Sequence, residues 1–154
     1  MSHPEILVDY PYSSRFVSSL KYIEKDNQFG QAENLNHACR IGDHYTVARL
    51  LNEGVDIESI DTNGFTPLLN AVNNENLSLV SFLINHGANI NYYCAQHHCS
   101  PLSIASSLGN VPMLHYLLEH GGDITFHDSL HRNLLHLAAT SGKTLACEYL
   151  VWCF

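Results

Sequence analysis

Apolar and polar positions along this chain follow a pattern that returns every 33 or 34 residues. The string Leu-Ile-Asn-His-Gly-Ala-Asn-Ile-Asn at 83–91 matches Leu-Leu-Asn-Glu-Gly-Val-Asp-Ile-Glu at 50–58, and Leu-Leu-Glu-His-Gly-Gly-Asp-Ile at 117–124 repeats it. A second block with the same spacing begins at Thr66, Ser100 and Asn133. Two blocks that share one period indicate an architecture built from similar units.

The second block predicts where a helix begins. Thr66 and Ser100 are good N-cap residues, because their hydroxyls accept a hydrogen bond from a free backbone N–H. Pro67 and Pro101 follow at the first helical position, where no N–H is needed. The polar stretch 73–76 then turns the chain into a second helix.

The second helix carries its apolar residues on one side. In the clearest unit these residues are Leu77, Val80, Leu83 and Ile84. Gly87 can adopt the left-handed conformation that ends this helix, and the turn-forming residues 61–64 predict a tight hairpin in front of the first helix. Each unit is therefore expected to fold as hairpin, helix, helix, with Leu83 buried.

This pattern resembles the ankyrin repeat, whose signature is Gly-x-Thr-Pro-Leu-His-x-Ala followed by Leu-Leu-x-x-Gly-Ala-Asp-Val-Asn. The resemblance implies an all-α repeat fold, an ankyrin solenoid of stacked helix-turn-helix units joined by short β-hairpin loops. It covers residues 32–154, with repeats expected at about 32–60, 61–93, 94–127 and 128–154, the last of them incomplete. Residues 1–31 are expected to form an N-terminal extension or a capping helix that starts at Ser13 or Ser14, with a free docking peptide as the alternative.

Some positions depart from the repeat signature. His98 stands where the turn glycine belongs, and its hairpin has one extra residue, so this hairpin tip is expected to be displaced. The signature His survives only as His136, and the resemblance implies that it ties neighbouring hairpins together by hydrogen bonds.

Composition narrows the classes of partner. The 154 residues suffice for one domain, and 7 basic against 15 acidic residues give a formal charge of −8 with no basic cluster. Such a chain repels nucleic acid and anionic membrane surfaces, so neither is expected as a partner. The N-terminus lacks a signal-like apolar core, and no apolar run approaches the roughly 20 residues that span a bilayer. We therefore expect a cytoplasmic protein, with the nucleus as the alternative compartment, whose five cysteines remain thiols.

Motifs of catalysis are missing from the sequence. It contains no phosphate-cradling glycine loop, no Gly-x-Ser-x-Gly and no His-Glu-x-x-His, so we expect no enzyme, no catalytic residue and no cofactor. The string Cys94-Ala95-Gln96-His97-His98-Cys99, with His127 and His131 in the next hairpin, contains zinc-type ligands. It lacks paired Cys-x-x-Cys halves, so no metal site is predicted, and a metal-responsive protein using this hairpin remains an alternative.

The resemblance implies that a partner protein contacts hairpin tips and the exposed face of the first helices. On this register the candidate partner-binding residues are Thr62, Asn63, Phe65, Asn73, Asn74, His97, His98, Ser107, Leu108, Leu130, His131, Thr140 and Ser141. Phe65 is the strongest candidate, because an exposed aromatic residue can anchor an interface. The predicted function is a non-catalytic protein-protein interaction module, scaffold or adaptor.

Two further expectations depend on the resemblance. The chain could be a short form of an ankyrin-type ubiquitin-ligase substrate-recognition subunit, although the C-terminal box that recruits the ligase does not follow Phe154. Asn91, with Leu83 eight residues upstream, looks like the ankyrin position that a cytoplasmic asparaginyl hydroxylase modifies, whereas Glu58 and Thr125 at the equivalent positions cannot be modified this way.

The final helix is apolar at its tip, where Leu150 precedes Val151-Trp152-Cys153-Phe154. Stacked repeats normally finish with a polar outward face. Residues 128–154 are therefore expected to be the least stable part of the chain, and self-association through this incomplete C-terminal repeat is an alternative use of Trp152 and Phe154.

Overall fold

The computed structural model describes residues 30–154, and the helix expected to start at Ser13 or Ser14 lies outside them. Residues 32–154 form one compact unit, which opens with a helix ending at Ile41. The helices that follow are α3 (His44–Asn52), α4 (Pro67–Asn73), α5 (Leu77–Asn85), α6 (Pro101–Leu108), α7 (Val111–Glu119), α8 (Leu134–Thr140) and α9 (Thr144–Cys153).

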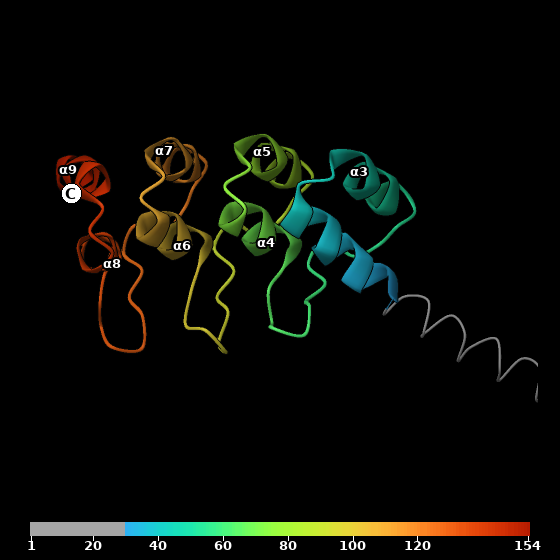
Figure 1. Cartoon of the computed structure of the whole chain (residues 1–154), viewed down its shortest axis with the longest axis horizontal. Helices are drawn as coiled ribbons and strands as arrows, with labels where there is room; N and C mark the ends of the chain where they lie inside the picture. Colours follow the sequence, from blue (N-terminus) through green and yellow to red (C-terminus); the bar gives the residue numbers. More distant parts are fainter. Residues whose placement is uncertain (1–29) are drawn as a thin grey trace, which may run out of the picture. The chain divides into compact units, whose positions relative to one another are not determined.

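The helices of this unit lie in two rows. Figure 1 shows α4, α6 and α8 side by side in an inner row and α3, α5, α7 and α9 in an outer row, with hairpin loops extending from the inner row. Each inner helix packs against its own outer helix and against the next inner helix, as α6 does with α7 and α8. The expected all-α stack of helix-turn-helix units is confirmed.

The predicted helix starts are confirmed by their capping hydrogen bonds. The Leu69 N–H donates to Thr66 Oγ1 at 3.3 Å, and Pro67 occupies the first turn of α4. Ser100 caps α6 in the same way, and the Ser103 side chain bonds back to complete a capping box. These local bonds fix where the inner helices begin.

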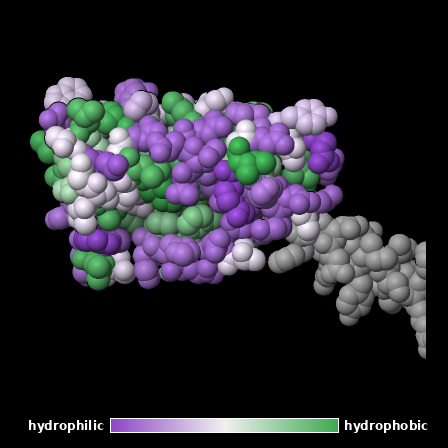
Figure 2. All heavy atoms as spheres, in the orientation of Figure 1, coloured by the Kyte–Doolittle hydropathy of each residue, from purple (hydrophilic) through white to green (hydrophobic). Residues whose placement is uncertain are grey.

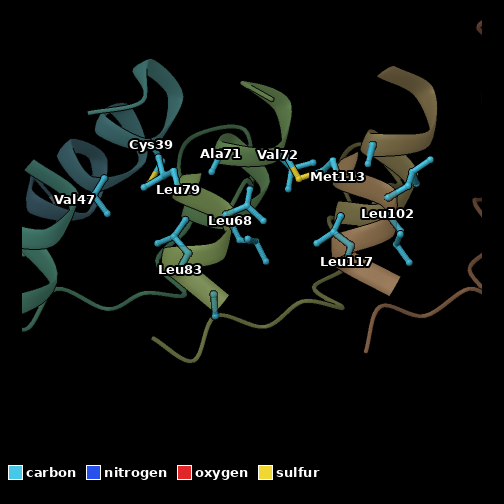
Figure 3. Packing of buried hydrophobic residues seen from close by; sticks show 14 of the residues in the cluster. Cys39, Val47, Leu68, Ala71, Val72, Leu79, Leu83, Leu102, Met113 and Leu117 are labelled. Carbon is cyan, nitrogen blue, oxygen red and sulfur yellow. The ribbon is translucent and has the colours of Figure 1, made fainter. Parts of the chain in front are cut away.

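The core is a continuous apolar seam between the two rows. Leu83 has no exposed surface, as predicted, and Figure 3 shows the side chains of this cluster pointing into the space between the helices. Leu77 and Ile84 are only partly buried and pack against its edge. Each unit buries a face that it could not bury alone, as expected of a stacked repeat.

The hairpin tips are held together by hydrogen bonds of two kinds. The Asp61 carboxylate accepts hydrogen bonds from the Asn63 and Phe65 N–H groups, and Gly64 takes a left-handed φ of 76°. In the next hairpin Cys94 replaces this aspartate, and an antiparallel bridge between Cys94 and Cys99 closes the loop instead. The longer tip is thus held by backbone bonds rather than by a carboxylate.

Two histidines occupy the position of the turn glycine. His98 has φ of 51° and His131 has φ of 58°, both in the left-handed region that ordinary side chains seldom adopt. The left-handed backbone conformation found at Gly64 is therefore kept in the later repeats, although a histidine replaces the glycine.

His136 acts within its own repeat. Its Nδ1 accepts a hydrogen bond from the Asn133 N–H at 3.2 Å, which completes a capping box at the start of α8. Among residues 30–154 the hydrogen bonds of its side chain include none to a neighbouring hairpin, so the implied cross-hairpin role is wrong. Another residue links hairpins, because the Tyr92 hydroxyl donates to the Gly64 carbonyl at 3.1 Å.

Candidate functional site

A groove lies between the inner helices and the hairpin tips of the later repeats. This groove encloses about 400 Å³ and is lined by Asn73, His97, His98, Cys99, Ser103, Ile104, Ser107, Leu108, Asp128, Ser129, Arg132 and Leu137. Helix α6 supplies most of its floor, and the tips at 97–99 and 128–132 form its walls. The residues come from three successive units, so only the stacked fold assembles them.

The floor of the groove contains aliphatic side chains beside serines of α6. Ile104 and Leu137 are partly buried, and both contribute to the lining. Asn70 occupies the equivalent position in the preceding unit, where its Nδ2 donates to Oδ1 of Asn36 on the first helix at 3.0 Å. Both asparagines are buried in this bond. The inner row thus changes from a buried asparagine at α4 to partly accessible aliphatic side chains at α6 and α8.

One wall carries a charged pair. Arg132 Nε and Nη2 both lie 2.7 Å from Asp128 Oδ2. Asp128 Oδ1 accepts the N–H groups of Leu130 and Arg132, as Asp61 does in its own hairpin. Burial opposes ionisation of Asp128, but the hydrogen bonds from Arg132 and Leu130 outweigh it and lower the pKa of this carboxyl below 3.8. The wall therefore presents a fixed ion pair.

The other wall consists of histidines held by aromatic neighbours. His97 packs edge-on against Phe65 with ring centroids 5.1 Å apart, and His98 Nδ1 lies 2.8 Å from the Tyr93 hydroxyl oxygen. Phe65 is consequently half-buried and does not line the groove. Phe65 is less exposed than expected, because His97 in the longer hairpin of the next repeat packs against its ring, and whether Phe65 contacts a partner stays a prediction.

The structure brings together some of the residues proposed from the sequence. Asn73, His97, His98, Ser107 and Leu108 all line the groove. The others are exposed outside it, namely Thr62, Asn63, Asn74, Leu130, His131, Thr140 and Ser141. Whether any of them contacts a partner stays a prediction.

Sequence reasoning missed Ile104, Arg132 and Leu137. Ile104 and Leu137 occupy the variable position of the Thr-Pro-Leu-His-x-Ala signature, where the unit before them has Asn70. This change from amide to aliphatic residue was the available signal. Arg132 gave no such signal, because its place in the groove depends on its bond to Asp128.

The cysteines and histidines of the hairpins do not form a reactive centre. Burial raises the pKa of the Cys99 thiol to about 12, and burial does the same at Cys39. These thiols stay protonated at neutral pH, which makes them poor nucleophiles. Within residues 30–154 no three His, Cys, Asp or Glu side chains are arranged to hold a metal ion.

Asn91 lies outside the groove and links two repeats. Its Nδ2 donates to the Gly121 carbonyl at 3.0 Å, and its Oδ1 accepts the Asp123 N–H at 2.8 Å. Glu58, one repeat earlier, makes only the second kind of bond, accepting the Asn89 N–H at 2.7 Å. Hydroxylation of Asn91 stays a prediction.

Helix α9 presents apolar side chains outward. Trp152 is 86% exposed, and Leu145, Val151 and Phe154 are also largely accessible. Figure 2 shows apolar side chains gathered on the viewed face at the end of the stack where this unit lies.

Among residues 30–154 no helix is both long enough and apolar enough to cross a lipid bilayer.

A family model described as ankyrin repeats, in three copies, matches residues 35–128. This range contains helices α3 to α7 and the groove wall that carries His97 and His98. It ends at Asp128, in the wall that carries the charged pair. The comparisons indicate no catalytic family.

Curated relatives share the repeats over part of the chain. The B-cell lymphoma 3 protein homolog of Mus musculus is 38% identical over 76 residues, which are 49% of this chain and 16% of that protein. The ankyrin repeat, SAM and basic leucine zipper domain-containing protein 1 is 42% identical over 60 residues in Notamacropus eugenii, covering 39% of this chain and 13% of that protein. In Ornithorhynchus anatinus the same protein is 35% identical over 92 residues, covering 58% of this chain and 18% of that protein. This chain thus spans less than a fifth of each of these relatives.

Proposed function

Since the chain belongs to the ankyrin-repeat family, whose repeats generally mediate protein–protein interaction, we propose that it is a non-catalytic recognition module or adaptor. Its partner protein would bind in the groove over α6 and α8. The observation that carries this proposal is the change along the inner row from Asn70, which is buried in a hydrogen bond to Asn36, to the partly accessible Ile104 and Leu137.

The groove combines the features of a protein interface. Its centre is aliphatic, from Ile104, Leu108 and Leu137, and its rim is polar, from the hairpin walls. A partner side chain placed over the aliphatic centre would remove apolar surface from water, while the rim would supply hydrogen bonds. The Asp128 carboxylate already anchors its hairpin, so binding requires little ordering of this wall.

We also propose a cytoplasmic location, with the nucleus as the alternative. All five cysteines are free thiols, two of them fully buried. Reduced cysteines are typical of these compartments.

A matched pair of substitutions tests the binding proposal. Ile104→Asn places in the floor the residue type that the preceding repeat carries there at Asn70, whereas Ile41→Asn makes the same change at a helical isoleucine that is 61% exposed outside the groove. Affinity enrichment from a lysate, quantified by mass spectrometry, should retain a set of proteins on the native chain and on Ile41→Asn that Ile104→Asn loses.

Thermal unfolding followed by circular dichroism provides the control for folding. Both variants should melt cooperatively, because neither position belongs to the fully buried core. If Ile104→Asn melts normally and still enriches the same proteins, the groove is not the binding surface.

A further inference from the structure

The two members of the Asp128–Arg132 ion pair differ in how accessible they are to a partner. The side chain of Asp128 is 5% exposed, whereas that of Arg132 is 40% exposed. A molecule that enters the groove therefore meets the guanidinium group rather than the carboxylate.

Both carboxylate oxygens of Asp128 already accept hydrogen bonds from the chain itself. Oδ1 accepts the Leu130 and Arg132 N–H groups, both at 2.9 Å, and Oδ2 accepts Nε and Nη2 of Arg132, both at 2.7 Å. A carboxylate has about four acceptor sites, so this one has none left for a donor on a partner. A basic side chain would gain little from Asp128.

Arg132, in contrast, keeps donors free. A guanidinium carries five N–H groups. Only Nε and one N–H of Nη2 are bonded to Asp128, and no acceptor within residues 30–154 meets the other three. These remaining groups lie at the exposed end of the side chain.

Arg132 is the only lysine or arginine among the residues that line the groove, and two other polar side chains there are already bonded. The Ser103 hydroxyl donates to the Ser100 carbonyl and accepts the Ser100 N–H, so its bonds are internal. His98 Nδ1 is paired with the Tyr93 hydroxyl. The guanidinium is thus the strongest donor in the groove that is still available.

From this geometry we infer that the partner segment is acidic: it places an aspartate or glutamate on Arg132 and a neighbouring aliphatic side chain over Ile104 and Leu137. A carboxylate matches the planar guanidinium and makes charge-assisted hydrogen bonds with it. The three residues line one groove, so a single short segment can contact all of them. This inference rests on the proposed function.

The charge of the whole chain argues for the opposite partner. A formal charge of −8 attracts basic segments at long range. At physiological salt, however, such fields are screened over about 8 Å. Contacts inside the groove depend on the local groups, and there the free donors belong to Arg132. The net charge of the chain and the free donors of Arg132 favour partner segments of opposite charge, and a peptide selection distinguishes the two.

The test uses a displayed library of random peptides selected on the full chain. Selected peptides should be enriched in Asp or Glu beside Leu, Ile or Val. For the tightest peptide, replacing its acidic residue by the corresponding amide should weaken binding about ten- to hundredfold, as measured by isothermal titration calorimetry. On Arg132→Gln the acidic and amide peptides should bind equally, while Arg132→Lys should keep part of the difference.

The variant Ile104→Asn separates the inference from the proposed function. If the selected peptides bind Ile104→Asn as tightly as the native chain, the groove is not used and the proposed function fails. If they require Ile104 but are enriched in Lys or Arg, or lose nothing on amide replacement, the groove binds partners and the acidic-segment inference is overturned. Circular dichroism of Arg132→Gln and Arg132→Lys confirms that the hairpin change leaves the fold intact.

Discussion

Asn91 accepts a hydrogen bond from the backbone N–H of Asp123, across the boundary between two successive repeats. The same amide donates to the Gly121 carbonyl, so a single side chain fixes one hairpin against the end of the next outer helix. Glu58 can only accept at the equivalent junction, because a carboxylate has no N–H to donate. The junction at Asn91 is therefore the more fully bonded of the two.

Asn91→Ala should destabilise the chain by about 1–2 kcal/mol, because it removes two partly solvated hydrogen bonds between repeats. Urea unfolding measures this change. Asn63→Ala, at an exposed hairpin tip, should cost much less. Equal costs for the two variants would mean that the Asn91 bonds contribute nothing to the stack.

Leu83→Ala should cost about 2–5 kcal/mol, because Leu83 is fully buried between neighbouring units. Unfolding in urea and melting by circular dichroism measure this loss. Asn63→Ala serves again as the surface control, and a larger effect at Asn63 than at Leu83 would contradict the observed packing.

The N-cap position of α9 is a place where the stability of the stack can be improved. Asp43, Asn76 and Asn110 cap the other outer helices with their side chains, whereas Lys143 at the equivalent position makes no capping bond. Lys143→Asn should therefore raise stability by about 0.5–2 kcal/mol, reduced by the loss of the lysine stem that packs over Gly109. A lower melting temperature than that of the native chain would show that this stem matters more than the cap.

Acid should lower the stability of the fold by protonating Asp43, which caps α3, and Asp128, which anchors a hairpin. Hydrogen bonds from the Thr46 side chain and backbone lower the pKa of Asp43, and those from Arg132 lower that of Asp128 against burial. Because the folded pKa lies below the ordinary 3.8, the stabilisation is complete above that value and is lost as pH falls through the folded pKa.

The unfolding free energy measured between about pH 6 and pH 2 should accordingly fall on the acid side. Asp128→Asn should be less stable than the native chain near neutrality, and its stability should decline less steeply with acid. A native-like acid slope in Asp128→Asn would exclude Asp128 as a source of the effect.

The sequence predicted those features that depend on neighbours in the chain. Thr66 and Pro67 mark the start of α4 by local bonds, and the spacing of Leu83 from Val80 defines a buried side without knowledge of other units. Such local preferences agree with the final fold.

Features that arise from stacking were not predictable in the same way. Phe65 looked exposed because His97, which covers it, belongs to the next repeat. Arg132 entered the groove only through its bond to Asp128, and His136 found its partner within its own helix start. In each case a contact absent from the repeat signature decided the position of the side chain.

The outward face of α9 leads to the last prediction. Repeats are stabilised by their interfaces with neighbours, and α9 buries Ala146 and Leu150 on one side while Trp152 and Phe154 stay exposed on the other. Exposed apolar groups of this kind favour association. Replacing Trp152 and Phe154 together by Ser should therefore improve solubility and shift sedimentation toward the monomer, without unfolding residues 32–127.

Limited proteolysis tests the companion expectation about local stability. Residues 128–154 have a packed neighbour on one side only within the described chain, so their opening should require less free energy than that of α5, whose unit is flanked on both sides. Cleavage should begin after about residue 128 in the native chain and at the same place in the double Ser variant. If this segment instead resists protease as long as α5 does in a monomeric sample, the C-terminal repeat is well packed, and the exposed Trp152 and Phe154 do not mark a weak end.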